Sequence, residues 1–537
     1  MNPDKARQSG SFVLVLVAMV LGVLIGVMVA SNPALRRASS QEDKIGEVTG
    51  LIESEYVDAI DPDSLSDRLL SVMLAELDPH STYLSARETE RTDEMMRGSF
   101  EGVGIVLHRE GDTTFVGQVL AGGPSAGSGL LPGDLIVTVD GDTVSGVGME
   151  ADSVVARLRG PRGSKVTVRV ERLKQKGGKN DTETLTFNIR RGVVGHQTVA
   201  CATMLDDTTG YIFLTSFSST SYDEFHDALR RLKARGMRKL IFDLRSNSGG
   251  SLSSAIGIAG ELLPAGSPIV YTQGAHSRRS DIKSHRGGLF TKGTVVVMVD
   301  ENSASASEVV AGALQDNDRA LIMGRRTFGK GLVQTEFTLK DGSSVLLTTA
   351  RYYTPSGRCI QRSYTGGTDK YYREYIEQLI GESYADSAKV HIADSTPYHT
   401  LGGRVVYGGG GIVPDRLLTY RKDQSFVYYN AIAGKGLLNK VAFANVRRHA
   451  GEWLMRYPNA EAFGRGFQTS PAMLAEVVAE GERAGVARDA ASLDAQRTLI
   501  CSMLKAYIGL ALYGNEAFHA AYLPVDEDLN QTLNMKL

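Results

Sequence analysis

The chain has 537 residues, which is enough for three or four domains of ordinary size and excludes a single small module. Apolar residues make up 42% and charged residues 22%, values of a folded globular protein that exclude a collagenous or broadly disordered chain. The 59 basic residues are balanced by 61 acidic ones, so no basic excess favours nucleic acid as a partner. Three widely spaced cysteines and ten scattered histidines form no zinc motif, and we expect no metal or other cofactor.

The first element expected along the chain is a membrane segment. Phe12 to Ala30 carries no charge and, as a helix, would extend roughly 28 Å, close to the hydrocarbon thickness of a bilayer. A cleaved signal peptide has a shorter apolar core, so this length favours an uncleaved anchor, although Met28-Val29-Ala30 is an acceptable cleavage site. Because the preceding tail, residues 1–11, is short and no second apolar span follows, we expect nearly all of the chain on the outer side of a membrane.

Four regions are expected after the anchor. Residues 31–97 have helical periodicity, and residues 98–174 have short strands with glycine punctuation and an Asp140-Gly141 turn, which is typical of a compact β-rich module. Residues 175–418 alternate strands and helices as an α/β layer does, and residues 419–537 are helical again. In the α/β region, the expected strands are 210–217, 239–244, 294–299, 320–323, 332–339 and 344–353, and the expected helices are 221–234, 253–263 and 305–315. The fold class is therefore multidomain α/β with helical ends.

A serine-rich corner is the first candidate for chemistry. Residues 302–308, with Ser303, Ser305 and Ser307, join an apolar strand to a helix, where a hydroxyl lies beside the free amides of the helix N-terminus. This geometry suits a nucleophile. The alternative is that these serines only cap the helix, since serine is a preferred capping residue.

Lys330 is the second candidate, because flanking Gly329 and Gly331 would let its backbone approach another segment closely. To act as a general base, a lysine needs its pKa lowered from about 10.4 toward neutrality, which requires burial without a paired carboxylate. Gln334, four residues further along an extended strand, would point to the same face and could hydrogen-bond the neutral amine. The alternative is an ordinary surface lysine.

A third candidate is the loop after the expected strand 239–244, where Gly249 and Gly250 could present backbone N–H groups as an oxyanion hole. Two other motifs are weaker. Residues 324–330 fit G-x-x-x-x-G-K, but Gly331 replaces the required Ser or Thr and no helix follows. Residues 123–127 fit G-x-S-x-G inside the β-rich module, where we expect an ordinary loop.

Together, these residues resemble the carboxy-terminal processing (tail-specific) proteases, a serine protease family that pairs a PDZ domain with a serine-lysine catalytic core. The resemblance extends from about Ile45 to Asp415. Its motifs, in chain order, are Leu77-Asp78-Pro79-His80-Ser81, Phe100-Glu101-Gly102-Val103-Gly104, Leu130-Leu131-Pro132-Gly133-Asp134, the Asp243 strand with Gly249-Gly250, Ser303 to Glu308, Phe328-Gly329-Lys330-Gly331 with Gln334, and Tyr407 to Asp415.

For the catalytic core, the resemblance implies particular residue roles. Ser305 would be the nucleophile, Lys330 the general base and Gln334 the residue that orients the lysine. The oxyanion hole would be the N–H of Ala306 with that of Gly249 or Gly250, and Asp316 matches an acidic position with a supporting role. One departure is Ser248, where the family usually has proline, so the choice between the two glycines stays open.

For the PDZ domain, the resemblance implies a groove for an extended C-terminal tail, with the carboxylate held by the amides of Gly102, Val103, Gly104 and Ile105. In the family, a bound tail can also switch the protease on, and Arg159 matches a position that contacts the core in the active state. A surface arginine at a helix C-terminus is the alternative explanation for Arg159.

The expected function is thus a serine endopeptidase, anchored through Phe12 to Ala30 in a bacterial inner membrane with its bulk in the periplasm. It would recognise free, apolar C-termini of protein substrates and cleave them through an acyl-enzyme. The alternatives are a catalytically inactive membrane-anchored PDZ adaptor and a nucleotide-binding protein. No role is assigned to the helical region 419–537 beyond homodimer formation, shielding of the active site or adaptor docking.

Overall fold

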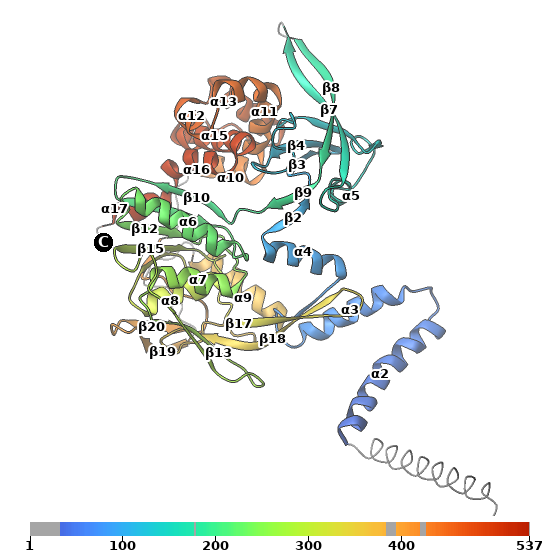
Figure 1. Cartoon of the computed structure of the whole chain (residues 1–537), viewed down its shortest axis with the longest axis vertical. Coiled ribbons are helices and arrows are strands. Elements are labelled where there is room, and N and C mark those ends of the chain that lie inside the picture. Colours follow the sequence, from blue (N-terminus) through green and yellow to red (C-terminus); the bar gives the residue numbers. More distant parts are fainter. Residues whose placement is uncertain (1–32, 177–178, 383–393, 419–425, 536–537) are drawn as a thin grey trace, which may run out of the picture. The chain divides into compact units, whose positions relative to one another are not determined.

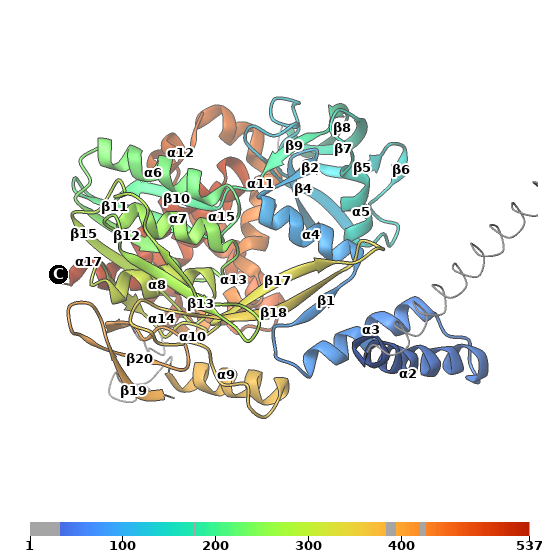
Figure 2. The same ribbon diagram turned by 60° about the horizontal axis from the view of Figure 1, so that its bottom comes forward.

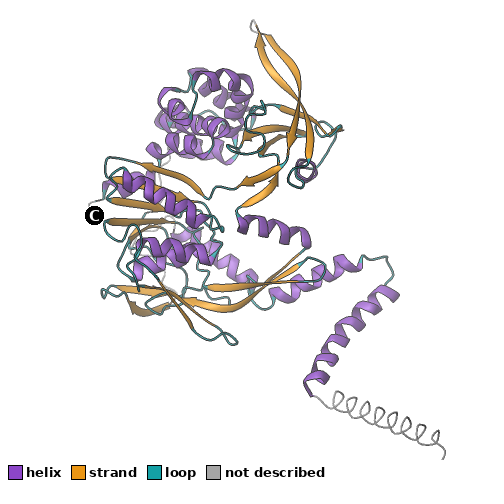
Figure 3. Ribbon diagram, in the orientation of Figure 1, coloured by secondary structure: helices purple, strands orange, loops and turns teal. Residues whose placement is uncertain are grey.

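The computed structural model describes residues 33–176, 179–382, 394–418 and 426–535, and the chain divides into two compact units, Met1–Leu77 and Asp78–Leu537 (Figures 1 and 3). Helices α2 (Pro33–Glu55) and α3 (Pro62–Ala75) form the described part of the first unit. Apolar side chains on both helices are exposed, among them Ile45 and Val72. Among the described helices, none combines the length and apolar character needed to cross a bilayer. The expected anchor, Phe12 to Ala30, lies outside the described residues.

The second unit is built around a mainly parallel sheet with the strand order β10-β11-β12-β15-β16-β21, in which only β10 runs antiparallel to its neighbour. These strands are β10 (Val199–Met204), β11 (Thr209–Leu214), β12 (Lys239–Asp243), β15 (Thr294–Val299), β16 (Leu321–Gly324) and β21 (Arg416–Leu417). Strands β12 and β15 read as continuous apolar runs because both of their faces are buried.

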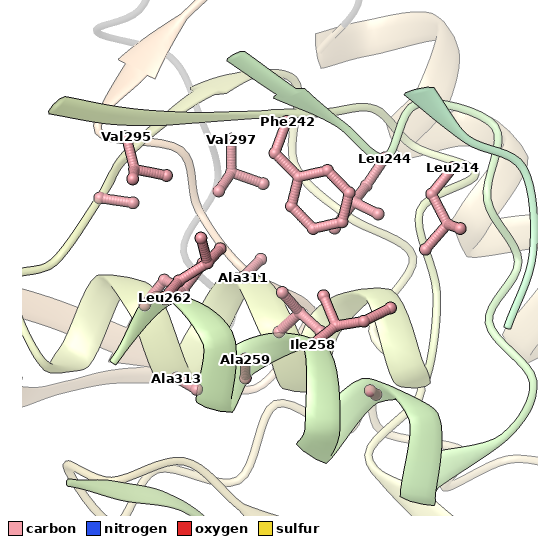
Figure 4. Packing of buried hydrophobic residues seen from close by; sticks show 14 of the residues in the cluster. Leu214, Phe242, Leu244, Ile258, Ala259, Leu262, Val295, Val297, Ala311 and Ala313 are labelled. Atoms are coloured by element: carbon pink, nitrogen blue, oxygen red, sulfur yellow. The ribbon is translucent and has the colours of Figure 1, made fainter. Parts of the chain in front are cut away.

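One face of this sheet packs against helices α6 (Ser221–Ala234), α7 (Leu252–Leu262) and α8 (Ala306–Asp316). Alternate strand residues, such as Phe242, Leu244 and Val297, point toward apolar residues of these helices, such as Ile258 (Figure 4). The opposite face packs against the end of the chain, which contributes Leu529 to a second buried cluster. The α/β layer predicted from the alternating pattern is therefore confirmed.

The β-rich module has a sheet with the order β3-β4-β5-β7-β8, and β6 pairs with β5. Its elements are β3 (Ile105–Glu110), β4 (Thr113–Val119), β5 (Leu135–Val139), β6 (Asp142–Thr143), α5 (Ala151–Leu158), β7 (Lys165–Lys176) and β8 (Lys179–Arg190). The predicted hairpin turn is present, because Asp140 and Gly141 both have positive φ (50° and 93°), as a type I′ turn requires. Strand β8 pairs with β7 along its whole length, so the sheet continues through Arg190, beyond the expected end of the module at residue 174.

A short antiparallel pair, β2 (Ser99–Gly102) with β9 (Gly192–Gly195), brings the two ends of the β-rich module together. Before it come β1 (Thr82–Leu84) and α4 (Ala86–Arg97). Strand β1 belongs to a further sheet with the order β1-β18-β13-β14, in which β17 also pairs with β18 (Figure 2). The other members of this sheet are β13 (Pro268–Gln273), β14 (Ser280–Lys283), β17 (Leu332–Thr338) and β18 (Ser344–Tyr353).

The end of the chain is helical, as predicted. After α9 (Thr368–Glu382) and the pair β19 (Asp394–His399) with β20 (Val405–Gly408), the remaining elements are α10 (Phe426–Gly434), α11 (Leu437–Arg456), α12 (Ala460–Gly466), α13 (Pro471–Arg483), α14 (Ala490–Ala495), α15 (Arg497–Tyr513), α16 (Asn515–Tyr522), η2 (Leu523–Val525) and α17 (Glu527–Asn534). Helix α11 packs on the β-rich module, where the Phe443 ring lies 3.7 Å from that of His108 and the Arg447 guanidinium lies 4.1 Å from the Phe115 ring centroid.

Candidate active site

Ser305 lies where β15 leads into α8, at the carboxyl end of the central sheet, where ligands bind in open α/β folds. It is the N-cap of α8 and has φ 55° and ψ −111°, a backbone conformation that is strained for a residue with a side chain. Its side chain is only partly buried, whereas Ser303 and Ser307 are fully buried. The structure thus exposes one of the three candidate serines on a strained corner.

The two neighbouring serines fasten this corner to the loop after β12. The Ser303 hydroxyl donates to the Leu244 carbonyl at 2.8 Å, and the Ser307 hydroxyl donates to the Asn247 carbonyl, also at 2.8 Å. The Ala304 N–H donates to the same Asn247 carbonyl at 3.0 Å. Ser303 and Ser307 therefore hold the Ser305 corner against the candidate oxyanion loop.

The buried carboxylate of Glu308 joins the Ser305 corner to the lysine segment. Its Oε2 accepts the N–H groups of Ser305 (2.8 Å) and Lys330 (2.9 Å). Its Oε1 accepts the Gly329 N–H (2.8 Å) and the Thr327 hydroxyl (2.5 Å). Burial raises the pKa of Glu308 to about 7, and the four hydrogen bonds oppose this rise.

Tyr352 of β18 links the same two segments through their carbonyl groups. Its hydroxyl, buried in the core, lies 2.7 Å from the Lys330 carbonyl oxygen and 3.2 Å from that of Ser305. Glu308 and Tyr352 thus hold both the N–H and the C=O groups of Ser305 and Lys330, which fixes the backbones of the two candidate catalytic residues relative to each other.

The Lys330 amine is in an environment that favours its neutral form. Burial lowers the pKa of Lys330, and the charges of Glu308 and Asp78 oppose this shift only in part. His80 lies close enough to feel the lysine charge, and burial together with that charge lowers the pKa of His80 to about 4. The His80 Nε2 is 3.1 Å from the hydroxyl of Tyr371 on α9. A neutral His80 carries no charge that would lower the pKa of Lys330 further.

Asp78 is held beside the lysine by a tight turn. Its Oδ1 accepts the N–H groups of His80 and Ser81, both at 2.8 Å, and its Oδ2 accepts the Ser81 hydroxyl at 2.7 Å. These hydrogen bonds outweigh burial and keep the pKa of Asp78 below its ordinary value. The Ser81 hydroxyl oxygen also accepts the Thr348 N–H, which fastens the turn to β18.

The side chains of Ser305, Lys330 and Gln334 are not linked by hydrogen bonds among the described residues. Strand β17 begins at Leu332, after Lys330, and its register shifts between Val333 and Gln334, so strand alternation does not decide whether the two side chains share a face. The Gln334 Nε2 is buried and has no partner in the described part of the chain. The catalytic roles expected for these three residues stay predictions.

The two glycines after β12 differ in the state of their N–H groups. The Gly249 N–H donates to the Asn247 side-chain oxygen at 2.9 Å. Gly250 forms a parallel bridge to Phe217 through its neighbours, so its own N–H points away from Phe217. Within the described ranges, neither the Gly250 N–H nor the Ala306 N–H has a hydrogen-bond partner. Gly249 lies against the corner, since a Cβ there would be 2.9 Å from the Ser305 Cβ.

Asp316 lies at the far end of α8 from Ser305, about 16 Å along an 11-residue helix. Its carboxylate is fully buried, pairs with the equally buried Arg358 at 2.7 Å and accepts the Ser356 N–H and hydroxyl. The structure thus does not bring Asp316 to Ser305. Its expected supporting role would have to act through the packing of α8.

The expected tail-binding segment lies at the open edge of the β-rich module, because β3 is the last strand of its sheet. The Leu120 N–H donates to the Gly104 carbonyl, so Ile105 faces Val119 without hydrogen bonds and its N–H points to the open edge. The N–H groups of Val103 and Gly104 also have no partner among the described residues. The Gly102 position belongs to β2, which pairs with β9.

Arg159 follows α5 and contacts α4. Its Nη1 donates to Glu94 Oε2 at 2.5 Å, and its guanidinium lies 5.1 Å from the centroid of the Phe100 ring. These residues line a cleft of about 630 Å³ between α4 and α5. In this structure, Arg159 thus contacts the connection into the β-rich module.

The weaker motifs have structural roles. Ser125 is buried and donates to the Val103 carbonyl at 2.6 Å, so the G-x-S-x-G segment is an ordinary loop. The G-x-x-x-x-G-K segment leads into strand β17, which excludes the helix that a phosphate loop needs. In the part of the chain that the structure describes, no group of His, Cys, Asp and Glu is placed to hold a metal ion.

The sequence predicts no role for Glu308, Asp78, His80 or Tyr352. Three of them lie in segments that carry the family resemblance, Leu77 to Ser81 and Ser303 to Glu308, and this was the available signal. Tyr352 lies in a predicted strand without any motif, so nothing in the sequence indicated its contact with the site.

Family comparisons match both parts of this architecture. Peptidase family S41 matches residues 208–370, a PDZ domain matches residues 115–172, and a family of unknown function matches residues 428–514. The first match contains Ser305, Lys330 and the glycine loop. The last one falls entirely within the helical end of the chain.

Several known proteins are similar over most of their length. The carboxy-terminal processing protease CtpA of Bacillus subtilis (strain 168) is 31% identical over 363 residues, which cover 66% of this chain and 76% of the relative. The carboxy-terminal-processing protease of Bartonella bacilliformis is 33% identical over 325 residues, covering 59% and 72%. Among solved structures, the photosystem II D1 C-terminal processing protease is 27% identical and covers 68% of this chain and 86% of its own, with a TM-score of 0.34.

Proposed function

Because the chain belongs to the carboxy-terminal processing proteases, serine peptidases of family S41 with a PDZ domain, we propose that Ser305 is its nucleophile and Lys330 its general base. The observation that carries this assignment is the shared acceptor: the N–H groups of both residues donate to Oε2 of Glu308. One carboxylate binds both segments, which are 25 residues apart in the sequence. The backbones of the serine and the lysine are therefore fixed relative to each other.

In the proposed reaction, the neutral Lys330 amine takes the proton of the Ser305 hydroxyl as the oxygen attacks a peptide carbonyl. The lysine ammonium then gives this proton to the leaving amine, and an acyl-enzyme on Ser305 remains. Water, deprotonated by Lys330, releases the acyl group and regenerates the hydroxyl. The lowered pKa of Lys330 supports this role, because a neutral amine is needed near neutral pH. The Gln334 Nε2, which has no partner among the described residues, is available to orient the lysine or the substrate.

The oxyanion would be held by the N–H groups of Ala306 and Gly250. Both are without a partner among the described residues, whereas the Gly249 N–H is already bound to Asn247. Backbone donors fixed before the reaction stabilise the developing charge without reorganisation. Gly249 then serves to let the loop approach Ser305 closely, since any side chain there would collide with the Ala304 carbonyl and the Ser305 Cβ.

The PDZ domain would bind the free C-terminus of a protein substrate as an added strand along β3. The Ile105 N–H points to this open edge, and the N–H groups of Val103 and Gly104 just before it have no partner among the described residues, so the three are available to a carboxylate. The partly buried apolar Ile105 and Leu107 belong to the cluster behind this strand and favour an apolar tail. Arg159 would then transmit the effect of tail binding to α4 through its ion pair with Glu94.

The uncharged run Phe12 to Ala30 supports anchoring in a bacterial inner membrane, with Asp78–Leu537 on the periplasmic side. The exposed apolar residues of α2 and α3 support pairing of two copies through the N-terminal helices. Release of the full chain from membrane vesicles by carbonate would contradict the anchor. A monomeric mass in detergent over the micromolar range would contradict the dimer.

Cleavage of an unstructured polypeptide with a free or an amidated C-terminus tests the enzymatic proposal. The full chain should cleave the free-tailed substrate preferentially, and Ser305→Ala and Lys330→Ala should abolish cleavage. Two exposed residues provide matched controls, Ser253→Ala and Lys292→Ala, which should cleave normally. If the unmutated chain binds the tail without cleaving it, the inactive PDZ adaptor is the correct function.

A further inference from the structure

The end of the chain reaches the loop that carries the proposed oxyanion donor. Arg245, which follows β12, lies between the carboxylates of Asp243 and Asp526. Its Nη1 and Nη2 donate to Asp526 Oδ1 (3.1 Å) and Oδ2 (2.6 Å), and its Nε and Nη2 donate to Asp243. Asp526 is 281 residues away and is the N-cap of α17. This contact joins the helical end of the chain to the residues just before Gly249 and Gly250.

A second carboxylate of the same helix extends this contact to two other strands. Oδ2 of Asp528 accepts from Nη1 of Arg325 at 2.9 Å and lies 3.5 Å from Nη1 of Arg245. Arg325 follows β16, and its Nε donates to Glu301, which follows β15, at 2.8 Å. The N-terminus of α17 therefore connects the loops that follow three neighbouring strands. These loops lie at the carboxyl ends of the strands, where Ser305 also lies.

The contact between Asp526 and Arg245 is buried, and apolar packing on either side of Asp526 holds it in place. The side chains of Asp526 and Asp243 are 2% and 0% exposed, and that of Arg245 is 15% exposed. Leu523 and Leu529, on either side of Asp526, pack into the cluster on the second face of the central sheet. A bidentate pair between buried groups fixes orientation strongly, and removal of one partner leaves the other charge uncompensated.

The loop that follows Arg245 needs such support, because it is strained. Ser246 has φ 59°, a left-handed conformation, and is held by its N–H, which donates to Asp300 at 2.8 Å. Gly250 comes four residues later, and the direction of its N–H depends on the path of this short segment. An oxyanion donor must be positioned within a fraction of an ångström, and misplacement by about 1 Å can reduce the rate about 100-fold.

We propose that Asp526, assisted by Asp528, is a positioning residue of the peptidase: through Arg245, it holds the loop 245–250 in the shape that aims the Gly250 N–H at the oxyanion. This proposal rests on the proposed function of Ser305. It gives the end of the chain, beyond the residues 428–514 that match a family of unknown function, an indirect part in catalysis.

The test compares Asp526→Asn with Glu476→Gln in the full chain. Asparagine caps a helix as well as aspartate, so Asp526→Asn removes the ion pair and leaves the cap of α17 intact. Both carboxylate oxygens of Glu476 accept from Nη2 of Arg448 inside the helical region, so Glu476→Gln is the control for the loss of an ion pair there. We expect Asp526→Asn to lower kcat about 10–100-fold with KM changed less than about 2-fold, and Glu476→Gln to change neither.

Hydrolysis of a small activated ester is the second readout, because a defective oxyanion hole slows every acyl substrate whether or not it binds the PDZ domain. The same fractional loss is expected for the ester and the polypeptide at temperatures well below the melting temperature, which the loss of a buried ion pair should lower. Equal kcat values for Asp526→Asn and the unmutated chain, or equal losses in both variants, would overturn the proposal. A loss confined to KM or to the polypeptide would overturn it as well.

Two further outcomes are informative. If Asp526→Asn does not fold, Asp528→Asn decides by the same criteria, with an expected kcat loss of about 3–10-fold. If the unmutated chain shows no Ser305-dependent hydrolysis, the proposed function fails and this proposal fails with it. If the unmutated chain and Asp526→Asn both hydrolyse the substrates normally, only the positioning role of Asp526 is overturned.

Discussion

Ser305 and Lys330 share one hydrogen-bond acceptor: both backbone N–H groups donate to Oε2 of Glu308, at 2.8 and 2.9 Å. This relationship does not depend on the side-chain rotamers of the serine and the lysine. Either side chain can therefore change its rotamer while the shared acceptor keeps the two backbones in place. The shared carboxylate explains how the two segments keep their relative position in the absence of substrate.

Glu308→Gln tests this shared acceptor. The glutamine NH₂ group cannot accept a hydrogen bond, so the backbone N–H groups that donate to the oxygen it replaces lose their partner. Each buried donor left without a partner costs about 1–3 kcal/mol of stability. We expect a lower melting temperature and a kcat reduced about 100-fold.

The matched control is Glu224→Gln, because Oε2 of Glu224 also accepts two N–H groups, those of Thr198 and Val199. This variant should lose stability and keep its kcat. Equal kcat losses in the two variants would mean that Glu308 contributes only to general stability.

Asp78→Asn tests the electrostatics of the lysine. The Asp78 charge raises the pKa of Lys330, so its removal should lower that pKa further and increase the neutral fraction at a given pH. The acidic limb of the kcat/KM profile should move to lower pH. Asp206→Asn, in a similar turn that accepts the N–H groups of Thr208 and Thr209, should leave the profile in place. An unchanged profile, or a shift to higher pH, in Asp78→Asn would contradict the role of Lys330 as the base.

Gly104→Ala tests the tail-binding edge of the PDZ domain. Gly104 has φ 75°, and a Cβ there would lie 2.9 Å from the Pro124 Cδ and 3.1 Å from the Gly123 Cα. The turn has to shift, so the affinity for a free C-terminal peptide should fall at least about 10-fold by fluorescence anisotropy. Gly122→Ala is a matched control, since Gly122 has φ 72° and a Cβ there would have no neighbouring atom within 4 Å. If both variants bind the peptide equally well, the tail binds elsewhere.

Arg159→Ala tests the link between tail binding and cleavage. It removes the ion pair with Glu94 and the contact with the Phe100 ring. We expect the preference for a free over an amidated tail to fall several-fold, because the bound PDZ domain is no longer coupled to α4. Arg157→Ala, two residues earlier on α5 and paired with Asp142, should retain the preference. Full tail stimulation in Arg159→Ala would remove Arg159 from the mechanism.

The regular elements of the second unit were largely predictable, because burial controls their composition. Both faces of β12 and β15 are covered, so these strands appear in the sequence as apolar runs. Strand β8 was not predicted because its polar residues alternate with only a few apolar ones, such as Leu185 and Phe187, on a sheet with one solvent-exposed face. The resemblance to a family indicated the module but not its last strand.

The candidate site was predictable only where a motif was present. Ser305 and Lys330 lie in such motifs, and the structure joins their backbones. The expected contact between Lys330 and Gln334 stays a prediction, because a register shift inside β17 breaks simple alternation, and such a shift leaves no mark in the sequence. The contact of Asp526 with Arg245 spans 281 residues, so it depends on the tertiary fold alone.

The most direct test of the central claim is covalent labelling of the full chain with a fluorophosphonate, followed by peptide mass spectrometry. The account predicts a single adduct on Ser305, with labelling strongly slowed in Lys330→Ala and unaffected in Lys292→Ala. An adduct on Ser303 or Ser307, or labelling that proceeds equally fast without Lys330, would contradict it.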